Sequence, residues 1–261
     1  MILQPGQSLS AIPQRIVSLV PSQTELLHYL GLEQQTLGIT KFCIHPVEWL
    51  SSKTIIGGTK NIHPEIIKAL QPDLIIANKE ENVQEQVEAL AADYPVLLTD
   101  VDTIAAALEM ISDIGQLTGT VIAADQLVSN IKKAFEKIVP AAPPVKTAYL
   151  IWNKPYMTIG GDTFINDILK KAGLQNVFEQ QQRYPQISIA DLEKENCQLV
   201  LLSSEPYPFK QKHIDELQQH LPHVKIMLVD GEMFSWYGSR MLLLPGYLNS
   251  MQREWSMVNG E

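Results

Sequence analysis

The 261-residue sequence has few cysteines, no long apolar run and no excess of positive charge. Its two cysteines, Cys43 and Cys197, fall in different halves of the chain, so we expect two unpaired thiols. No apolar run approaches the ~18–20 residues of a membrane-spanning helix. The formal net charge of −9 argues against a nucleic-acid-binding protein, because phosphate binding relies on clustered lysines and arginines.

The sequence also lacks the common nucleotide-binding and catalytic motifs. It contains no P-loop, no GxGxxG after a predicted strand, no GxSxG and no HExxH. No acid–base set is evident for proton transfer. We therefore predict that the protein is not an enzyme and holds no permanently bound cofactor.

The first fourteen residues, MILQPGQSLSAIPQ, have neither the basic nor the apolar segment of a secretion signal. Two readings of this segment stay open. Either the protein is cytoplasmic, or a signal was removed and Met1 takes its place.

A long helical stretch separates two similar halves of the chain. Between residues 103 and 139, apolar residues recur at spacings of three and four, which predicts helix. Gly119 predicts a joint between two consecutive helices, of which the second runs from Thr120 to Pro140. On both sides, strand and helix signals alternate, which indicates an α/β fold.

The predicted elements are short and regularly spaced. Strands are expected at Arg15–Val20, Thr36–Thr40, 72–77, 95–100, 147–152, 198–204 and 224–230. Helices are expected at Ser22–Leu30, His63–Leu70, Asn82–Ala92, 162–174, 187–196, His213–Leu221 and Ser239–Trp255. Ser22 and Glu25 are spaced as a capping box, and Pro245 is expected to kink the last helix.

The two halves also share an internal repeat. The segment Ile67–Glu80 aligns without gaps on Leu192–Glu205, and each of the two segments contains an apolar strand and ends at a glutamate. Each copy then leads through a helix to a strand that ends in aspartate, Asp100 or Asp230. The repeat favours two α/β lobes tied together by a long helix.

The segment FCIHP contains two candidate metal ligands close together in the sequence. Cys43 and His45 stand two residues apart and could both reach a soft metal, with His63 as a further candidate ligand. The alternative is ordinary loop packing, because alternate residues of an extended segment share a face in any case.

Aromatic residues follow several predicted strands, where open α/β sheets bind ligands. Core packing is expected for Trp49 and Trp255. In EMFSWYGSR, however, Trp236 and Tyr237 stand beside Arg240 in a predicted loop. Exposed rings in a loop indicate contact with a large flat ligand.

Four segments together resemble a known family, the substrate-binding proteins of metal-chelate ABC importers. They are RIVSLVPSQTELLHYLGL with LGIT, GGTKNIHPEIIKALQPDLIIA, GGDTFINDILKKAGLQNVF and YPQISIADL. Each motif is loose, but their order and spacing are specific, and the match runs from about Arg15 to Trp255. Members of this family bind cobalamin, siderophores or haem.

The resemblance implies the class III periplasmic-binding-protein fold, with two Rossmann-like lobes of parallel sheet joined by a long backbone helix. The expected domains are residues 1–119, the linking helix 120–142 and residues 143–261. The chelate would bind in the cleft between the lobes. Expected ligand contacts are Pro21, Ser22, Phe42, Gly58, Thr59, Trp152, Phe234, Trp236, Tyr237 and Arg240.

The resemblance further implies one glutamate on each lobe that docks on the membrane permease. Glu65 matches the first position, and the repeat suggests Glu205 for the second. One departure is Asn78, which stands where the family has an aromatic residue.

We therefore expect a periplasmic, monomeric receptor that captures a metal chelate, in the first place cobalamin or another corrinoid, and delivers it to an ABC permease. A haem or ferric-siderophore receptor is the alternative. An alternative of another class is a cytoplasmic metal-handling protein or enzyme that uses Cys43, His45 and His63.

Overall fold

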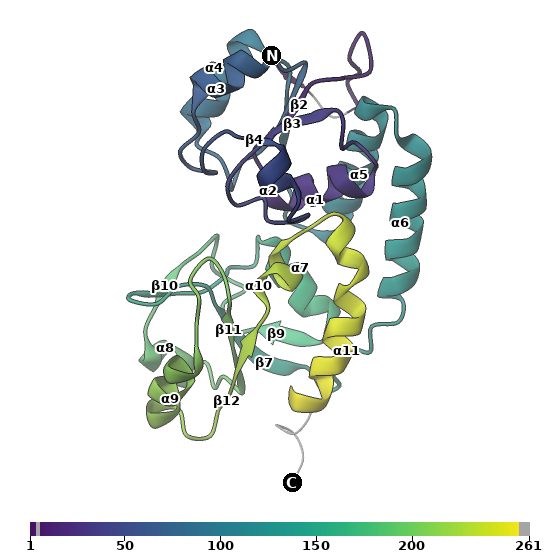
Figure 1. Ribbon diagram of the computed structural model, residues 1–261. Coiled ribbons are helices and arrows are strands. Elements are labelled where there is room, and N and C mark those ends of the chain that lie inside the picture. Colours follow the sequence, from purple (N-terminus) through teal and green to yellow (C-terminus); the bar gives the residue numbers. More distant parts are fainter. Residues whose placement is uncertain (4–5, 256–261) are drawn as a thin grey trace. The chain divides into compact units, whose positions relative to one another are not determined.

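In the computed structural model, which describes residues 1–3 and 6–255, the chain divides into two compact units (Figure 1). Unit 1 consists of Met1–Val101, Ala105–Lys132 and the short segment Trp236–Arg240. Unit 2 consists of Asp102–Ile104, Lys133–Ser235 and the chain from Met241 on. The five residues Trp236–Arg240 therefore belong to unit 1, although they come late in the sequence.

Within the described residues, the sheet of unit 1 has six parallel strands in the order β1-β6-β5-β2-β3-β4. The strands are β1 (Ile2–Leu3), β2 (Ile16–Ser18), β3 (Thr36–Ile39), β4 (Thr54–Ile55), β5 (Leu74–Asn78) and β6 (Val96–Thr99). The helices are α1 (Pro21–Tyr29), α2 (Trp49–Ser52), α3 (Pro64–Leu70), α4 (Gln84–Asp93), α5 (Ile104–Thr118) and α6 (Val121–Phe135). Val17 and Ile75 from the central strands pack with Ile67 and Val87 from the helices in one core cluster.

Unit 2, again within the described residues, has a parallel sheet in the order β12-β11-β7-β9 and a small antiparallel ribbon of β8 and β10. The strands are β7 (Val145–Leu150), β8 (Tyr156–Met157), β9 (Leu174–Asn176), β10 (Gln186–Ile187), β11 (Leu199–Ser203) and β12 (Lys225–Val229). The helices are α7 (Phe164–Lys171), α8 (Ile189–Lys194), α9 (Gln211–His220), α10 (Gly231–Ser235) and α11 (Leu244–Trp255), and the 3₁₀ turn η1 (Ser239–Leu242) starts in unit 1 and ends in unit 2.

The two sheets repeat one topology, as the internal similarity predicts. Strand β11 lies 125 positions after β5 at both of its ends, and both strands are buried along their whole length. The order β6-β5-β2-β3 in unit 1 corresponds strand by strand to β12-β11-β7-β9 in unit 2. The predicted fold class, two α/β lobes with parallel sheets, is confirmed.

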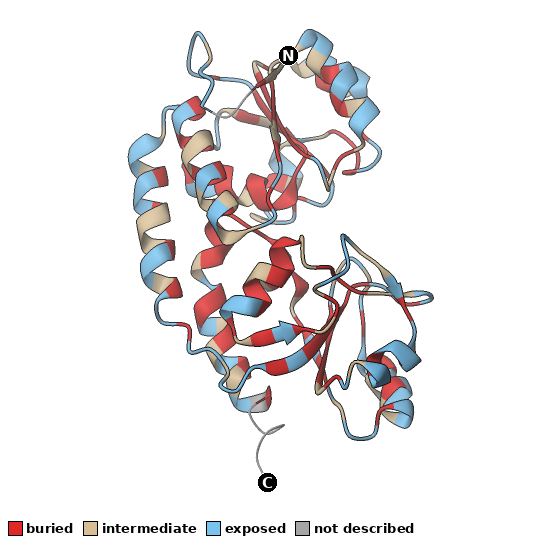
Figure 2. Ribbon diagram, turned by 180° about the vertical axis from the view of Figure 1, so that it is seen from behind, coloured by how far each residue is buried: buried red, intermediate tan, exposed pale blue. Residues whose placement is uncertain are grey.

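The predicted joint between the two long helices is confirmed at Gly119, which separates α5 from α6 with φ at +71°. A side chain is unfavourable at that φ, and a Cβ would lie 2.7 Å from Ile12 Cδ1. Helix α6 buries Leu127 and Ile131 on one face and exposes the other (Figure 2). It ends at Phe135, earlier than predicted.

The described residues contain no helix that is both long and apolar enough to span a membrane. The proposed domain limits at residues 119 and 142 stay a prediction.

The predicted kink at Pro245 is wrong. Helix α11 begins at Leu244, so Pro245 lies in its first turn. There its missing N–H costs nothing, because the first backbone N–H groups of a helix have no partner within the helix. The preceding residues Ser239–Leu242 form the separate turn η1.

Candidate functional site

The carboxyl ends of parallel strands are where open α/β sheets bind ligands, particularly where the strand order reverses. In unit 1 that reversal lies between β2 and β5, because β3 follows β2 on one side and β5 pairs on the other. The loops at this edge carry Pro21 after β2, Phe42 after β3 and Gly58–Thr59 after β4. The topology thus brings four of the predicted contacts to one edge of one sheet.

Phe42 is an exposed ring at this edge, with half of its surface accessible (50%). Two neighbouring residues border the ring. Lys41 Nζ lies 5.2 Å from the ring centre, within cation–π range. On the other side, a Cβ on Gly58 would lie 3.2 Å from Phe42 Cε2, so glycine leaves the ring the room it occupies.

Cys43, beside this ring in sequence, is fully buried. Its Sγ lies 3.1 Å from Thr24 Oγ1 and 3.2 Å from Thr40 Oγ1. Burial raises the pKa of the Cys43 thiol, so the thiolate needed for metal ligation is disfavoured. His63 instead lies 3.6 Å from the Glu65 carboxylate. Among the residues that the structure describes, no three His, Cys, Asp or Glu side chains form a metal-holding group.

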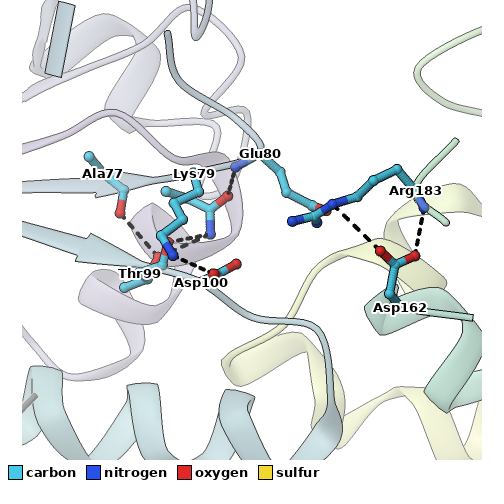
Figure 3. A network of polar contacts seen from close by, with 8 residues as sticks. Ala77, Lys79, Glu80, Thr99, Asp100, Asp162 and Arg183 are labelled. Carbon is cyan, nitrogen blue, oxygen red and sulfur yellow. Dashed lines mark hydrogen bonds and ion pairs between the residues drawn. The ribbon is translucent and has the colours of Figure 1, made fainter. Parts of the chain in front are cut away.

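Asn78, where the resembled family has an aromatic residue, organises the end of β5, next to the ion pair of Lys79 and Asp100 that Figure 3 shows. Its Oδ1 accepts hydrogen bonds from the backbone N–H of Glu80 at 2.8 Å and Glu81 at 3.2 Å. Its Nδ2 donates to the Thr99 carbonyl at 3.1 Å. The next residue, Lys79, pairs with Asp100 at 2.6 Å. Asn78 is thus buried and fully engaged in closing the loop between β5 and α4.

The predicted capping box at Ser22 and Glu25 is wrong. Helix α1 starts at Pro21, its N-cap is Val20, and no side chain caps it. The Glu25 carboxylate instead accepts two hydrogen bonds from Arg240, from Nε and Nη2, each at 2.9 Å. Arg240 is 8% exposed, so this is a bidentate and largely desolvated ion pair.

The ion pair anchors the segment Trp236–Arg240 on unit 1. The Arg240 guanidinium lies 4.9 Å from the centre of the Trp236 ring, and His45 meets the same ring edge-on at 5.4 Å between centroids. Gly238, at φ +109°, comes close to Leu26 of α1. The expected exposure of Trp236 and Tyr237 is therefore wrong, since they are 7% and 6% exposed.

In unit 2 the corresponding edge is built around Trp152, which follows β7 and is 40% exposed. Its ring meets Tyr207 edge-on at 5.6 Å. The Tyr207 hydroxyl lies 3.3 Å from Asn153 Nδ2 and 3.2 Å from His213 Nε2. Since His213 Nδ1 accepts from the Lys210 N–H at 2.8 Å, the neutral imidazole carries its proton on Nε2 and donates to Tyr207.

The supporting residues Asn153 and His213 were missed by sequence reasoning. Their neighbour Tyr207 follows the predicted strand at residues 198–204, where aromatic residues are expected near a ligand. Asn153 directly follows the exposed Trp152, and this adjacency is the signal that could have identified it. Its Oδ1 is buried without a hydrogen-bond partner in the part of the chain that the structure describes.

Phe234 is placed away from any surface. It is fully buried, and its ring packs at 5.2 Å from Tyr149 and at 6.1 Å from Tyr247 within unit 2.

The two docking candidates differ in how accessible they are. Glu65 is in the first turn of α3, and 72% of its side chain is exposed. Glu205 is half-buried, and its carboxylate accepts a hydrogen bond from Ser235 Oγ at 2.7 Å.

Comparison with known proteins identifies the family of the chain. A family model described as periplasmic binding protein matches residues 16–226. The vitamin B12-binding protein of Pectobacterium atrosepticum is 26% identical over 243 residues, which cover 89% of this chain and 86% of that protein. The ABC transporter substrate-binding lipoprotein YvrC of Bacillus subtilis is 26% identical over 247 residues, which cover 88% of this chain and 77% of that protein.

A solved structure of the same fold is the periplasmic haem-binding protein HutB of Vibrio cholerae, with a TM-score of 0.77 at 21% identity, covering 94% of this chain and 98% of that one. Members of this family are substrate-binding receptors rather than enzymes, and they are periplasmic or anchored as lipoproteins. The family model covers most of the chain, and the expectation drawn from the four sequence motifs is confirmed: the chain belongs to the periplasmic binding protein family, as a substrate-binding protein of the ABC-importer type.

Proposed function

We propose that this protein is the receptor of an ABC importer for a metal chelate of the cobalamin type. The observation that carries the proposal is an exposed aromatic ring at the carboxyl edge of the sheet in each unit, Phe42 in unit 1 and Trp152 in unit 2. Large exposed rings at this edge suit a ligand with an extended apolar face. The similarity to vitamin B12-binding proteins supports a corrinoid as that ligand.

In this proposal the ligand packs on Phe42 and Trp152, and the loops of Pro21–Ser22 and Gly58–Thr59 shape the edge around Phe42. The residues Trp236, Tyr237 and Arg240 have a different part. Because Arg240 is bound to Glu25 and stacks on Trp236, these side chains hold the segment 236–240 in place. Phe234 is a core residue and is not included among the contacts.

We further propose that the receptor works as a periplasmic monomer and delivers its ligand to the permease. Glu65 is the stronger candidate for docking, because its carboxylate projects from the first turn of α3 and is exposed. Glu205 is the weaker candidate, because its carboxylate is held by Ser235.

Isothermal titration with cyanocobalamin, haemin and a ferric hydroxamate siderophore tests this proposal. We expect cyanocobalamin to bind at micromolar concentration or tighter. Replacing Phe42 or Trp152 by alanine is expected to weaken binding by about tenfold, as for loss of a stacked aromatic contact. Tyr29→Ala is the matched control, since Tyr29 is an exposed aromatic ring at the far end of α1 from Pro21 and should leave the affinity unchanged.

If haemin or the siderophore binds tightly and cyanocobalamin does not bind, the protein is still a chelate receptor, but its ligand is not a corrinoid. If no chelate binds and the protein instead takes up stoichiometric zinc or cobalt that Cys43→Ser abolishes, the receptor proposal is overturned in favour of metal handling.

A further inference from the structure

One lysine of unit 1 is set apart from the others. Residues 1–101 contain five lysines, and the Nζ atoms of four of them contact oxygen atoms. Lys53 and Lys60 donate to the carbonyls of Glu33 and Glu80, while Lys68 and Lys79 pair with Asp93 and Asp100. Lys41 Nζ, by contrast, lies over the Phe42 ring and has no oxygen partner among the residues that the structure describes.

Lys41 also borders a hollow in unit 1 with a volume of about 300 Å³. The hollow is lined by Lys41, Ile55, Gly57, Gly58, Asn61, His63 and Ile66. Among the described residues its lining contains no carboxylate, and the Lys41 ammonium is the one fixed charge that they supply. Gly58 belongs both to this lining and to the contact with Phe42, so the hollow adjoins the exposed ring.

We propose that Lys41 and this hollow form a subsite for an anionic oxygen group carried by the chelate, either a carboxylate or a phosphate ester. The inference rests on the proposed function, because the chelate that packs on Phe42 brings this group to Lys41. An ammonium that is free of protein carboxylates gains a charge-assisted hydrogen bond without losing an existing ion pair. In a protein with a net charge of −9, it also offsets the general repulsion of an anionic ligand.

The Glu65 carboxylate lies 3.6 Å from Nδ1 of His63, a residue that lines the hollow, and is largely exposed. Solvent and salt screen its repulsion of a bound anion. The contact between Lys41 and the ring keeps the ammonium at the rim of the hollow before the ligand arrives.

Two pairs of chelates test the subsite, because each pair differs in its anionic group. Cyanocobalamin carries a phosphodiester that dicyanocobinamide lacks, and haemin carries carboxylates that its dimethyl ester lacks. Affinities are measured by isothermal titration for the wild type, Lys41→Met and Lys41→Arg. Lys68→Met is the matched control, since Lys68 lies on α3 and pairs with Asp93.

We expect Lys41→Met to weaken binding of the anionic member of the bound pair by about 5- to 20-fold, and binding of its uncharged counterpart less than about 2-fold. Lys41→Arg should restore most of the loss, and added salt should reduce the difference. The pair that responds identifies the group as phosphate ester or carboxylate.

An equal effect of Lys41→Met on both members of a pair, or no effect on either, would overturn this inference alone. Failure of every chelate to bind the wild type would overturn the proposed function and this inference with it.

Discussion

The two units carry the same parallel sheet but present different surfaces at its carboxyl edge. In unit 1 the turn after the central strand β5 is closed by Asn78, and in unit 2 the turn after β11 is closed by Ser203, 125 positions later. Both side chains accept a hydrogen bond from the backbone N–H two residues on, so the repeat conserves the turn geometry although the residue type has changed.

The units differ in what surrounds that turn. Unit 1 carries the exposed ring of Phe42, with the Lys41 ammonium and the hollow beside it. Unit 2 offers Trp152, supported by a hydrogen-bonded group of Tyr207, Asn153 and His213. A duplicated scaffold thus fixes where ligand loops project, while the loops themselves decide what they contact.

The substitution Arg240→Ala should lower the free energy of unfolding the most, and it acts on a feature of unit 1, the anchored segment Trp236–Arg240. Unit 1 includes this segment from late in the sequence, and the change leaves the partly buried Glu25 carboxylate, 20% exposed, without this partner. We expect a loss of about 2–4 kcal/mol in the free energy of unfolding, measured by urea denaturation. Lys68→Ala, which breaks an exposed ion pair, should cost less than about 1 kcal/mol. Equal losses in the two variants would show that the Arg240 pair does not anchor the segment.

The equivalence of the two turns is tested by Asn78→Ala and Ser203→Ala. The first change leaves two backbone N–H groups without their acceptor and removes one of two donors to the Thr99 carbonyl, which keeps the Lys79 N–H, and we expect a loss of about 2 kcal/mol. The second removes one backbone contact and the acceptor of the Tyr149 hydroxyl at 3.1 Å, for which about 1 kcal/mol is expected. Hydrogen exchange should show faster opening of the mutated turn only. Opening spread evenly over the chain would argue against two equivalent local turns.

A smaller effect than that of Arg240→Ala, visible only at high pH, concerns the buried thiol of unit 2. Burial raises the pKa of Cys197 to about 11, above its usual value near 9. Between these values the unfolded chain releases the thiol proton and the native chain keeps it, so this contribution to stability is present below pH 9 and is lost as the pH rises toward 11. In Cys197→Ala, the fall in unfolding free energy between pH 8 and 10.5 should be smaller than in the wild type by about 1–2 kcal/mol. Identical pH profiles would contradict the raised pKa.

The sheets could be predicted from the sequence because their signals are local. The apolar runs of β5 and β11 stand between turn residues, and the same apolar spacing recurs 125 positions later. The edge strands β1, β4 and β9 were missed. Each is two or three residues long and is defined by pairing with β6, β3 or β7 rather than by a pattern of its own.

The site could be predicted only in part. Phe42 and Trp152 were expected to contact a ligand, and both rings are exposed, but the contact itself stays a prediction. The buried state of Trp236 and the engagement of Arg240 could not be predicted, because the partner Glu25 lies 215 positions away in the sequence. A capping pattern at Ser22–Glu25 gave a local explanation for a residue whose contact is long-range.

Hydrogen exchange of the free and cyanocobalamin-saturated protein, followed by mass spectrometry, tests the receptor account most directly. The account predicts slower exchange on binding in the loops that carry Phe42 and Gly58 in unit 1 and Trp152 in unit 2, with little change in α9 and α11. Unchanged exchange in these loops at a saturating ligand concentration, or protection confined to other parts of the chain, would contradict it.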